Sequence, residues 1–287
     1  MVSSACRRAA VHELRDQRGY SERRACALIG CPRSTSQYRF KRTADLGLLA
    51  LIHQLVEENR RSGYRKLHFI LRRDHAIAMN HKRFYRIYRA ADLQVRRRIK
   101  RHARYVRGAT SPTVTRPNER WSMDFVHDTL ANGRNVRLLT VIDDFTAESI
   151  AIEIDSSLPA RRVIRVLERV AVERGYPATV KFDNGPEFSS IAMLKWGAER
   201  NVKLHFIDPG KPTQNGNIES FNGRMRDEVL NEHWFLTMEQ IRATVEAWRI
   251  RYNTHRLHGS LNYLTPAEFA HRHGEERKNA RPQFEAA

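Results

Sequence analysis

Apolar positions in the second half of the chain fall into two patterns that predict different elements. Short apolar or alternating runs predict strands, and apolar side chains spaced three and four residues apart predict helices. The helix over residues 159–175 would bury Val163, Val166, Leu167 and Val170 and end at Gly175. The expected strands cover residues 120–130, 136–146, 149–155, 178–185 and 203–208, and a further helix covers residues 191–201. A meander followed by alternating helices and strands predicts an α/β fold with a mixed sheet and flanking helices.

The first hundred residues carry helical patterns without strands. Ser21 can cap a helix that Gly30 ends, and Pro32 then begins a second helix. A second segment follows with three helical stretches, and Asn80 can cap the last of them, which has Phe84 and Ile87 on its apolar side. Both segments are predicted to be helix–turn–helix units. The simpler alternative is a pair of helical hairpins with solvated basic faces.

The charge distribution separates these two halves. The chain has 51 Lys and Arg against 32 Asp and Glu, a net charge of +19. Residues 1–110 hold 27 basic and 8 acidic side chains, whereas the rest of the chain holds 24 of each. A basic part joined to a neutral part indicates a module that binds a polyanion, here nucleic acid, attached to a part with another task. The tract from Arg96 to Gly108 is expected to be a basic connector.

The sequence excludes several other classes. No apolar run reaches the roughly 20 residues that span a bilayer. Three cysteines within the first 31 residues provide no disulfide framework, so we expect a reduced, cytoplasmic protein. Because nucleic acid is the expected partner, we also expect the protein to associate with the nucleoid. The spacing of Cys26 and Cys31 does not match a zinc site.

Three carboxylates lie where chemistry is expected. Asp124 lies within the first strand, and Asp183 lies at the carboxyl end of a later, parallel strand, where α/β folds bind ligands. Glu219 lies near the start of a helix that follows a polar loop. Three acids from three elements form a hard-oxygen site that suits Mg²⁺ or Mn²⁺, and two such ions can support an in-line phosphoryl displacement.

Two other acidic positions compete for this role. Asp143 and Asp144 follow the second strand and precede the third, so we expect them to form a hairpin turn. We expect Glu187 to support the site or to cap a helix rather than to bind metal.

The flanking residues resemble a known family. Thirty-five residues separate Asp183 from Glu219, and the segments WSMDFV, DNGPEF, TQNGNIESFNGRMRDE and YNTHRLHGSLNYLTPAEF surround them. Together they resemble the second-frame product of DDE transposases of the IS-three-type insertion sequences, with a retroviral-integrase-like core. One departure is Arg256-Leu257-His258, where the family usually has Arg-Pro-His.

The resemblance implies a ribonuclease H-like catalytic core and a function in DNA cleavage and strand transfer. Asp124, Asp183 and Glu219 would be the catalytic metal ligands, with two Mg²⁺ or Mn²⁺ ions. The implied partners are element-end and target DNA, further copies of the chain on DNA, and an upstream-frame helical protein or frameshift fusion. DNA contacts are expected near the triad from Arg226, Asn184, Gln214 and Asn215, and in the basic part from Arg33, Gln37, Lys82, Arg83, Arg86 and Arg89.

These observations predict a domain order and leave two alternative functions. A first DNA-binding segment would cover residues 1–44, a second 45–95, a basic linker 96–116, the catalytic core 117–275 and a tail 276–287. One alternative is a DNA-binding regulator with a silent core. The other is a nuclease of the ribonuclease H or resolvase type.

Overall fold

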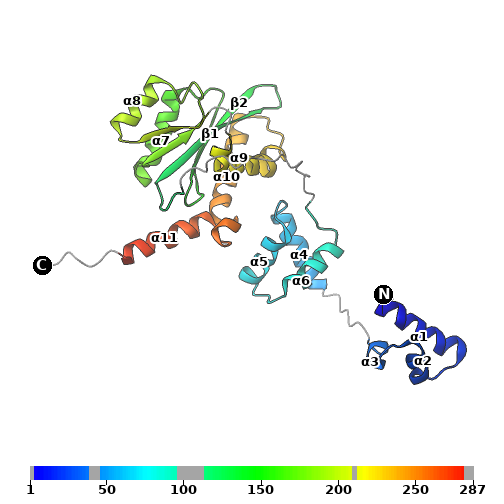
Figure 1. Cartoon of the computed structure of the whole chain (residues 1–287). Coiled ribbons are helices and arrows are strands. Elements are labelled where there is room, and N and C mark those ends of the chain that lie inside the picture. The colour runs from blue at the N-terminus through cyan, green and yellow to red at the C-terminus, as the bar shows by residue number, and fades with distance from the viewer. Residues whose placement is uncertain (1–2, 39–45, 96–112, 209–211, 281–287) are drawn as a thin grey trace. The chain divides into compact units, whose positions relative to one another are not determined.

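The computed structural model describes residues 3–38, 46–95, 113–208 and 212–280 (Figure 1). The chain divides into two compact units, residues 1–51 and 52–287, and each is described by itself. Most of the predicted basic linker and the end of the predicted tail lie outside the described residues. No helix among the described residues is long and apolar enough to cross a membrane.

The described residues of the first unit form the helices α1 (Ser4–Arg18), α2 (Glu22–Ile29) and α3 (Arg33–Ser36), and the unit also includes the start of the next helix. Ser21 caps α2 by accepting from the backbone of Arg24, and Gly30 ends it in the left-handed conformation, as predicted. Cys26 and Cys31 are free and pack in the apolar core of this unit. The second helix, predicted over residues 32–40, is only one turn long where the structure describes it, because α3 ends at Ser36 and Gln37 and Tyr38 are no longer helical.

Three further helices precede the sheet. They are α4 (Leu46–Glu58), α5 (Tyr64–Asp74) and α6 (His81–Ala90). Asn80 caps α6 by accepting from the backbone of Lys82, which confirms the predicted helix start. Phe84 and Tyr88 are the buried residues of α6, whereas Ile87 is only half-buried. We refer to residues 52–95 as the second helical module.

The sheet has five strands in the order β3-β2-β1-β4-β5. β1 (Arg120–Thr129), β2 (Asn135–Asp143) and β3 (Ser149–Asp155) form an antiparallel meander. β4 (Thr179–Phe182) then pairs parallel with β1, and β5 (Lys203–Phe206) pairs parallel with β4. The predicted mixed sheet and the parallel strand before Asp183 are therefore confirmed.

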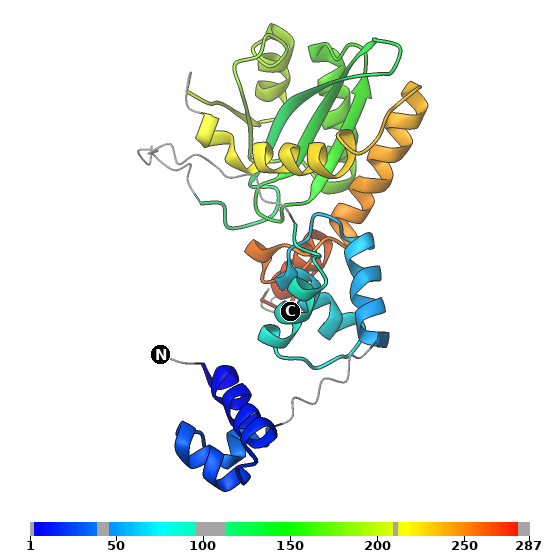
Figure 2. The ribbon, with the colours of Figure 1, turned by 90° about the vertical axis from the view of Figure 1, so that its right-hand side faces the viewer.

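Helices cover both faces of this sheet. α7 (Ala160–Arg174) and α8 (Ile191–Glu199) pack on the face that presents Trp121 and Met123. All four predicted apolar residues of α7 are buried there. α9 (Gly216–Met225) and α10 (Met238–Thr254) cover the opposite face, where α9 crosses the strands (Figure 2).

Two short turns that are not α-helical flank α9. Pro212–Asn215 forms a short 3-10 turn (η1) before α9, and Arg226–Leu230 forms a π-helical turn (η2) after it. The predicted apolar stripe is buried at Ile218, Phe221, Met225 and Val229, and it runs from α9 into η2. The last described elements are a short turn, η3 (Gly259–Leu261), and α11 (Pro266–Ala280).

Candidate active site

Asp124 lies in the middle of β1, on the face covered by α9. Strand alternation explains this side, because Trp121 and Met123 point into the opposite core. One oxygen, Oδ1, accepts from the backbone nitrogen of Phe125 at 2.8 Å, and the other accepts from the side-chain amide of Asn222 at 2.8 Å. Asn222 in turn accepts from the hydroxyl of Thr140 at 2.9 Å. Strand β1 and helix α9 are thus joined through the carboxylate of Asp124.

Asp183 directly follows β4, and its side chain bonds to the backbone of the turn that comes next. Its Oδ1 accepts from the backbone nitrogen of Gly185 at 3.1 Å. A Cβ at position 185 would lie 3.0 Å from that oxygen, so the close approach favours glycine. Neither Asn184 nor Gly185 is among the described residues with positive φ, so the approach of the carboxylate, and not a left-handed backbone, accounts for the glycine.

Glu219 lies in the first turn of α9 and is exposed. Burial raises the pKa of its carboxyl above the usual value. The turn that precedes α9 is tied to the sheet, because the buried amine of Lys181 in β4 donates to the backbone oxygen of Gln214 at 2.8 Å. Lys181 therefore links the strand before Asp183 to the segment before Glu219.

The carboxyl of Asp124 is influenced by the charges of the other two acids. Burial, together with the charges of Asp183 and Glu219, raises the pKa of Asp124 to about 6, although the hydrogen bonds from Phe125 and Asn222 oppose the shift. The described residues contain no group of three or more His, Cys, Asp and Glu side chains arranged to hold a metal. Asp183 and Glu219 thus act on Asp124 through their charges, although the three acids do not form a closed ligand set.

The donor set nevertheless fits a hard divalent cation. All three side chains offer carboxylate oxygens, which Mg²⁺ and Mn²⁺ prefer. A half-buried carboxyl whose pKa is raised by burial and by two like charges gains most from a nearby cation. The residues present are thus chemically suited to the predicted ions.

The carboxylates of the rival pair, Asp143 and Asp144, are bound by groups within the fold. Asp143 accepts from the backbone nitrogens of Asn118, Phe145 and Thr146, which confirms its predicted turn role. Asp144 forms a 2.5 Å ion pair with Arg120 and also accepts from the hydroxyl of Ser122. Both acids are therefore bound by hydrogen bonds and charge inside the fold, so their contribution to stability exceeds that of a surface turn.

Near the triad, the expected DNA contacts differ in accessibility. Arg226 and Asn184 are exposed, although they donate to the backbone oxygens of His127 and Ile207 at 3.0 Å each. Gln214 is half-buried and bonds through its side chain to Asp208. Asn215 is only 3% exposed and lies with its amide 3.5 Å from the backbone oxygen of Met123. A DNA contact from Asn215 therefore requires rearrangement of η1, contrary to the expectation of an available side chain.

The expected contacts in the basic part face solvent. Lys82, Arg83, Arg86 and Arg89 of α6 are exposed, as predicted. Arg33 and Gln37 are also exposed, and both approach Glu22, through a 3.6 Å ion pair and a 3.0 Å hydrogen bond. These observations leave all six side chains accessible without testing whether they contact DNA.

Three features of the site did not emerge from the sequence. The first is the amide bridge from Asn222 to Asp124, and the second is the buried position of Lys181. The third is Arg137, which forms a 2.5 Å ion pair with Glu187 and lies 4.2 Å from the ring centre of Phe125. The supporting role expected for Glu187 agrees with this pairing. Polar residues in otherwise apolar strands were the available signal for Thr140 and Lys181.

Comparisons with known proteins agree with this geometry. Models of the integrase core domain match residues 114–212 and 200–266, and a model of an HTH-like domain matches residues 43–101. The chain is 49% identical over 261 residues to an uncharacterized 31.7 kDa protein of insertion element IS407 from Burkholderia multivorans, covering 91% of this chain and 94% of that protein. The chain belongs to the DDE transposase family of the IS-three-type insertion sequences.

Other members of this family show the same relationship. An uncharacterized 39.2 kDa protein of insertion element IS476 from Xanthomonas euvesicatoria is 43% identical, covering 92% of this chain and 76% of that protein. The putative transposase InsK of IS150 from Escherichia coli is 29% identical, covering 83% and 89%.

A solved structure supports the fold of this family member. The simian T-cell lymphotropic virus intasome, in complex with a regulatory subunit of PP2A, contains a chain that matches with a TM-score of 0.50 and 17% identity. The match covers 77% of this chain and 74% of that one. At this identity the likeness concerns fold alone, and it agrees with the predicted ribonuclease H-like integrase core.

Proposed function

We propose that the protein is a transposase that cleaves DNA at the ends of an insertion element and joins the freed ends to target DNA. Asp124, Asp183 and Glu219 would hold one or two Mg²⁺ or Mn²⁺ ions. The observation that carries the proposal is that Asp183, at the end of β4, and Glu219, at the start of α9, both act through their charges on the carboxyl of Asp124 in β1.

The reaction consists of two phosphodiester exchanges. In the first, the oxygen of water bonds to phosphorus at the element end, the bond to the 3′ oxygen breaks, and that oxygen takes a proton to leave as a hydroxyl. In the second, this 3′-hydroxyl loses its proton and bonds to a target phosphorus, and a target 3′ oxygen departs. Divalent ions held by Asp124, Asp183 and Glu219 would activate the attacking oxygen and stabilise the departing one. No covalent bond between protein and DNA is needed.

The residues of the chain contribute position and charge. Asn222 and the backbone of Phe125 hold the two oxygens of Asp124, and Gly185 holds one oxygen of Asp183. Lys181 fixes the turn that leads to Glu219. Arg226 is exposed on the segment after α9 and carries a charge suited to a DNA phosphate.

The wider organisation stays part of the proposal. The basic residues of the N-terminal part would bind duplex DNA, and the predicted domain order of residues 1–44, 45–95, 96–116, 117–275 and 276–287 would separate binding from chemistry. Self-association on DNA and fusion to an upstream helical frame complete the expected assembly.

The test uses an end-labelled duplex built from the inverted repeats that flank the gene. The protein is expected to nick this duplex in Mg²⁺ and to leave it intact in EDTA, while Asp227→Asn, an exposed carboxylate on η2, retains activity. Preferential cleavage of an RNA–DNA hybrid would indicate a ribonuclease H-type nuclease instead. Binding to the duplex without any metal-dependent cleavage would indicate a regulator with a silent core.

A further inference from the structure

The turn η2, which follows α9, carries a carboxylate that is held by hydrogen bonds from two side chains. Glu228 of η2 accepts from the guanidinium of Arg256 at 3.1 Å and from the indole nitrogen of Trp248 at 3.0 Å. Burial alone would raise the pKa of Glu228, but these two partners and the charge of Lys66 lower it below its usual value. Glu228 is therefore held as an anion directly beyond the helix that carries Glu219.

The second helical module contacts this same part of the core. Arg61 forms a 3.5 Å ion pair with Glu232, and Arg73 forms a 3.3 Å ion pair with Glu268 in α11. The rings of Phe69 and Tyr263 stack with centres 5.1 Å apart and planes inclined by 14°. The contacts come from α5 and the loop before it and reach three segments of the core.

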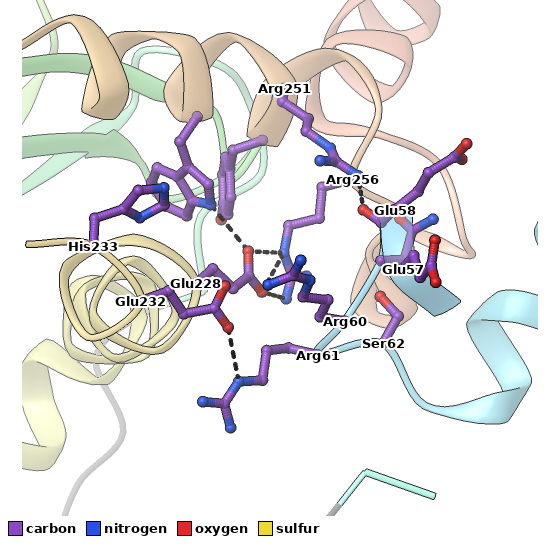
Figure 3. Close-up of a pocket in the computed structure, with 13 residues that line it drawn as sticks. Glu57, Glu58, Arg60, Arg61, Ser62, Glu228, Glu232, His233, Arg251 and Arg256 are labelled. Carbon is purple, nitrogen blue, oxygen red and sulfur yellow. Dashed lines mark hydrogen bonds and ion pairs between the residues drawn. The ribbon is translucent and has the colours of Figure 1, made fainter. Parts of the chain in front are cut away.

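A cavity of about 350 Å³ lies along the line of these contacts (Figure 3). Residues 57–62 line one side, and Glu228, Glu232, Arg251 and Arg256 line the other. The guanidinium of Arg251 donates across it to the backbone oxygen of Glu58, as the dashed lines show (Figure 3). The two sides therefore meet through polar groups around a space that water can fill.

Two ion pairs cross the contact in the same sense. The module supplies the bases Arg61 and Arg73, and the core supplies the acids Glu232 and Glu268. Lys66 is near Glu228 but also near the core cations Arg256 and Arg224, so it is not part of this pairing. The exposed bases of α6 are not among these residues. The module thus uses one set of cations toward the core and leaves a second set open to solvent.

From this arrangement we infer that the core surface formed by η2 and α11 is the docking surface for the second helical module of the same chain, and that docking sets the position of α9. The reason is continuity, because η2 follows α9 without a break and carries Glu228. A module held at Arg61 and Arg73 restrains the chain at Glu232, directly after η2, and η2 leads back to the helix that carries Glu219. The catalytic role of Glu219, which makes the position of α9 important, rests on the proposed function.

The π-helical turn gives this coupling a structural basis. A π turn contains one residue more than an α turn, and such turns are common at functional sites. In η2 the wide turn contains Glu228, while Val229 and Leu230 pack in the core beside Met225. The buried pair anchors the turn, and the acid remains available to Arg256 and Lys66.

Cross-linking in the full-length protein tests the docking. Cys6 is exposed and is replaced by serine, whereas Cys26 and Cys31 are buried and are kept. Glu58→Cys and Arg251→Cys are then joined with a short bismaleimide. An intrachain product is expected, and Arg61→Glu should lower its rate of formation about tenfold, because an attraction becomes a repulsion.

Two further variants separate charge pairing from general damage. Adding Glu232→Arg to Arg61→Glu should restore cross-linking. Arg242→Glu is the matched control, because Arg242 pairs with Asp155 at 3.6 Å within the core and has the same exposure, 45% against 44% for Arg61. Products that join two chains, or a rate that Arg61→Glu leaves unchanged, would overturn the docking.

Hydrogen exchange of residues 216–230 tests the coupling without any reaction. Exchange should be faster in Arg61→Glu than in the parent and should return to the parent rate in the restored double variant. Unchanged exchange in α9 while cross-linking falls would overturn the coupling. Both readouts hold whether or not the protein transposes DNA, so failure of the proposed function is distinguished from failure of this inference.

Discussion

Replacing Asp124 with asparagine should stabilise the metal-free protein while removing its activity. In the folded state burial and the charges of Asp183 and Glu219 raise the pKa of Asp124 to about 6, against 3.8 for an unperturbed group. Between these two values the folded state holds a proton that the unfolded state has lost. The free energy of unfolding therefore falls as pH rises through this window, and the cost is fully present at pH 7.5.

The magnitude follows from the shift and from the hydrogen bonds. A shift of about two pKa units corresponds to about 3 kcal/mol, which asparagine would recover by removing the charge. Part of this gain is lost because the amide of Asn222 donates to Oδ2 of Asp124, and an asparagine places a second donor there. One mispaired hydrogen bond costs about 1–2 kcal/mol. We expect a net stabilisation of about 1–2 kcal/mol for Asp124→Asn at pH 7.5 in EDTA.

Urea unfolding at several pH values provides the assay. The advantage of Asp124→Asn over wild type should shrink as pH falls from 6 toward 4, because the wild-type carboxyl then takes up its proton. Mg²⁺ should stabilise wild type more than the variant, because a ligand that binds only the folded state shifts the unfolding equilibrium. Asp227→Asn serves as the exposed carboxylate control and should change little. Destabilisation of metal-free Asp124→Asn by 1 kcal/mol or more would refute the electrostatic reasoning.

Three other substitutions test separate parts of the account. Lys66→Met should stabilise the protein at pH 7, because burial and the charges of Arg256 and Arg224 lower the pKa of Lys66 to about 8, although the charge of Glu228 opposes this shift. The free energy of unfolding of wild type should rise between pH 8 and 10.5, and that of the variant should rise less. Urea unfolding at each pH measures both. Asp144→Ala should cost about 3 kcal/mol by leaving buried Lys181 without the carboxylate 3.5 Å away, and Lys181→Met should recover most of this loss in thermal unfolding. Gly197→Ala should cost about 1–3 kcal/mol in urea, because its Cβ would lie 2.9 Å from the side chain of Leu204, whereas Gly223→Ala enters open space and should cost nothing.

The sequence predicted the parts of the fold that depend on local patterns. The apolar stripe of α7, the caps at Ser21 and Asn80, and the strand before Asp183 each follow from spacing or turn chemistry within a few residues. These signals are short-range, so one chain without relatives is sufficient to interpret them. The family resemblance supplied the choice of three acids among many.

Contacts between distant segments were outside the reach of the sequence. Lys181 is charged and would be expected to face solvent, yet it is 2% exposed because Asp144 and the turn before α9 enclose it. The bridge from Asn222 to Asp124 joins residues 98 positions apart, which no periodicity reveals. Helix α3 ends at Ser36, earlier than the sequence predicted. Helix propensity is a weak signal that the surrounding tertiary structure can override.

Strand transfer with a pre-cleaved element end tests the central claim most directly. A labelled duplex that already carries the free 3′-hydroxyl is incubated in Mg²⁺ with a plasmid target, and the joined product is measured for wild type, Asp183→Asn and Asp227→Asn. The account predicts joining by wild type and Asp227→Asn, and loss of joining in Asp183→Asn with duplex binding retained. Joining by Asp183→Asn at the wild-type rate, in a folded protein, would contradict the assignment of this carboxylate and with it the proposed active site.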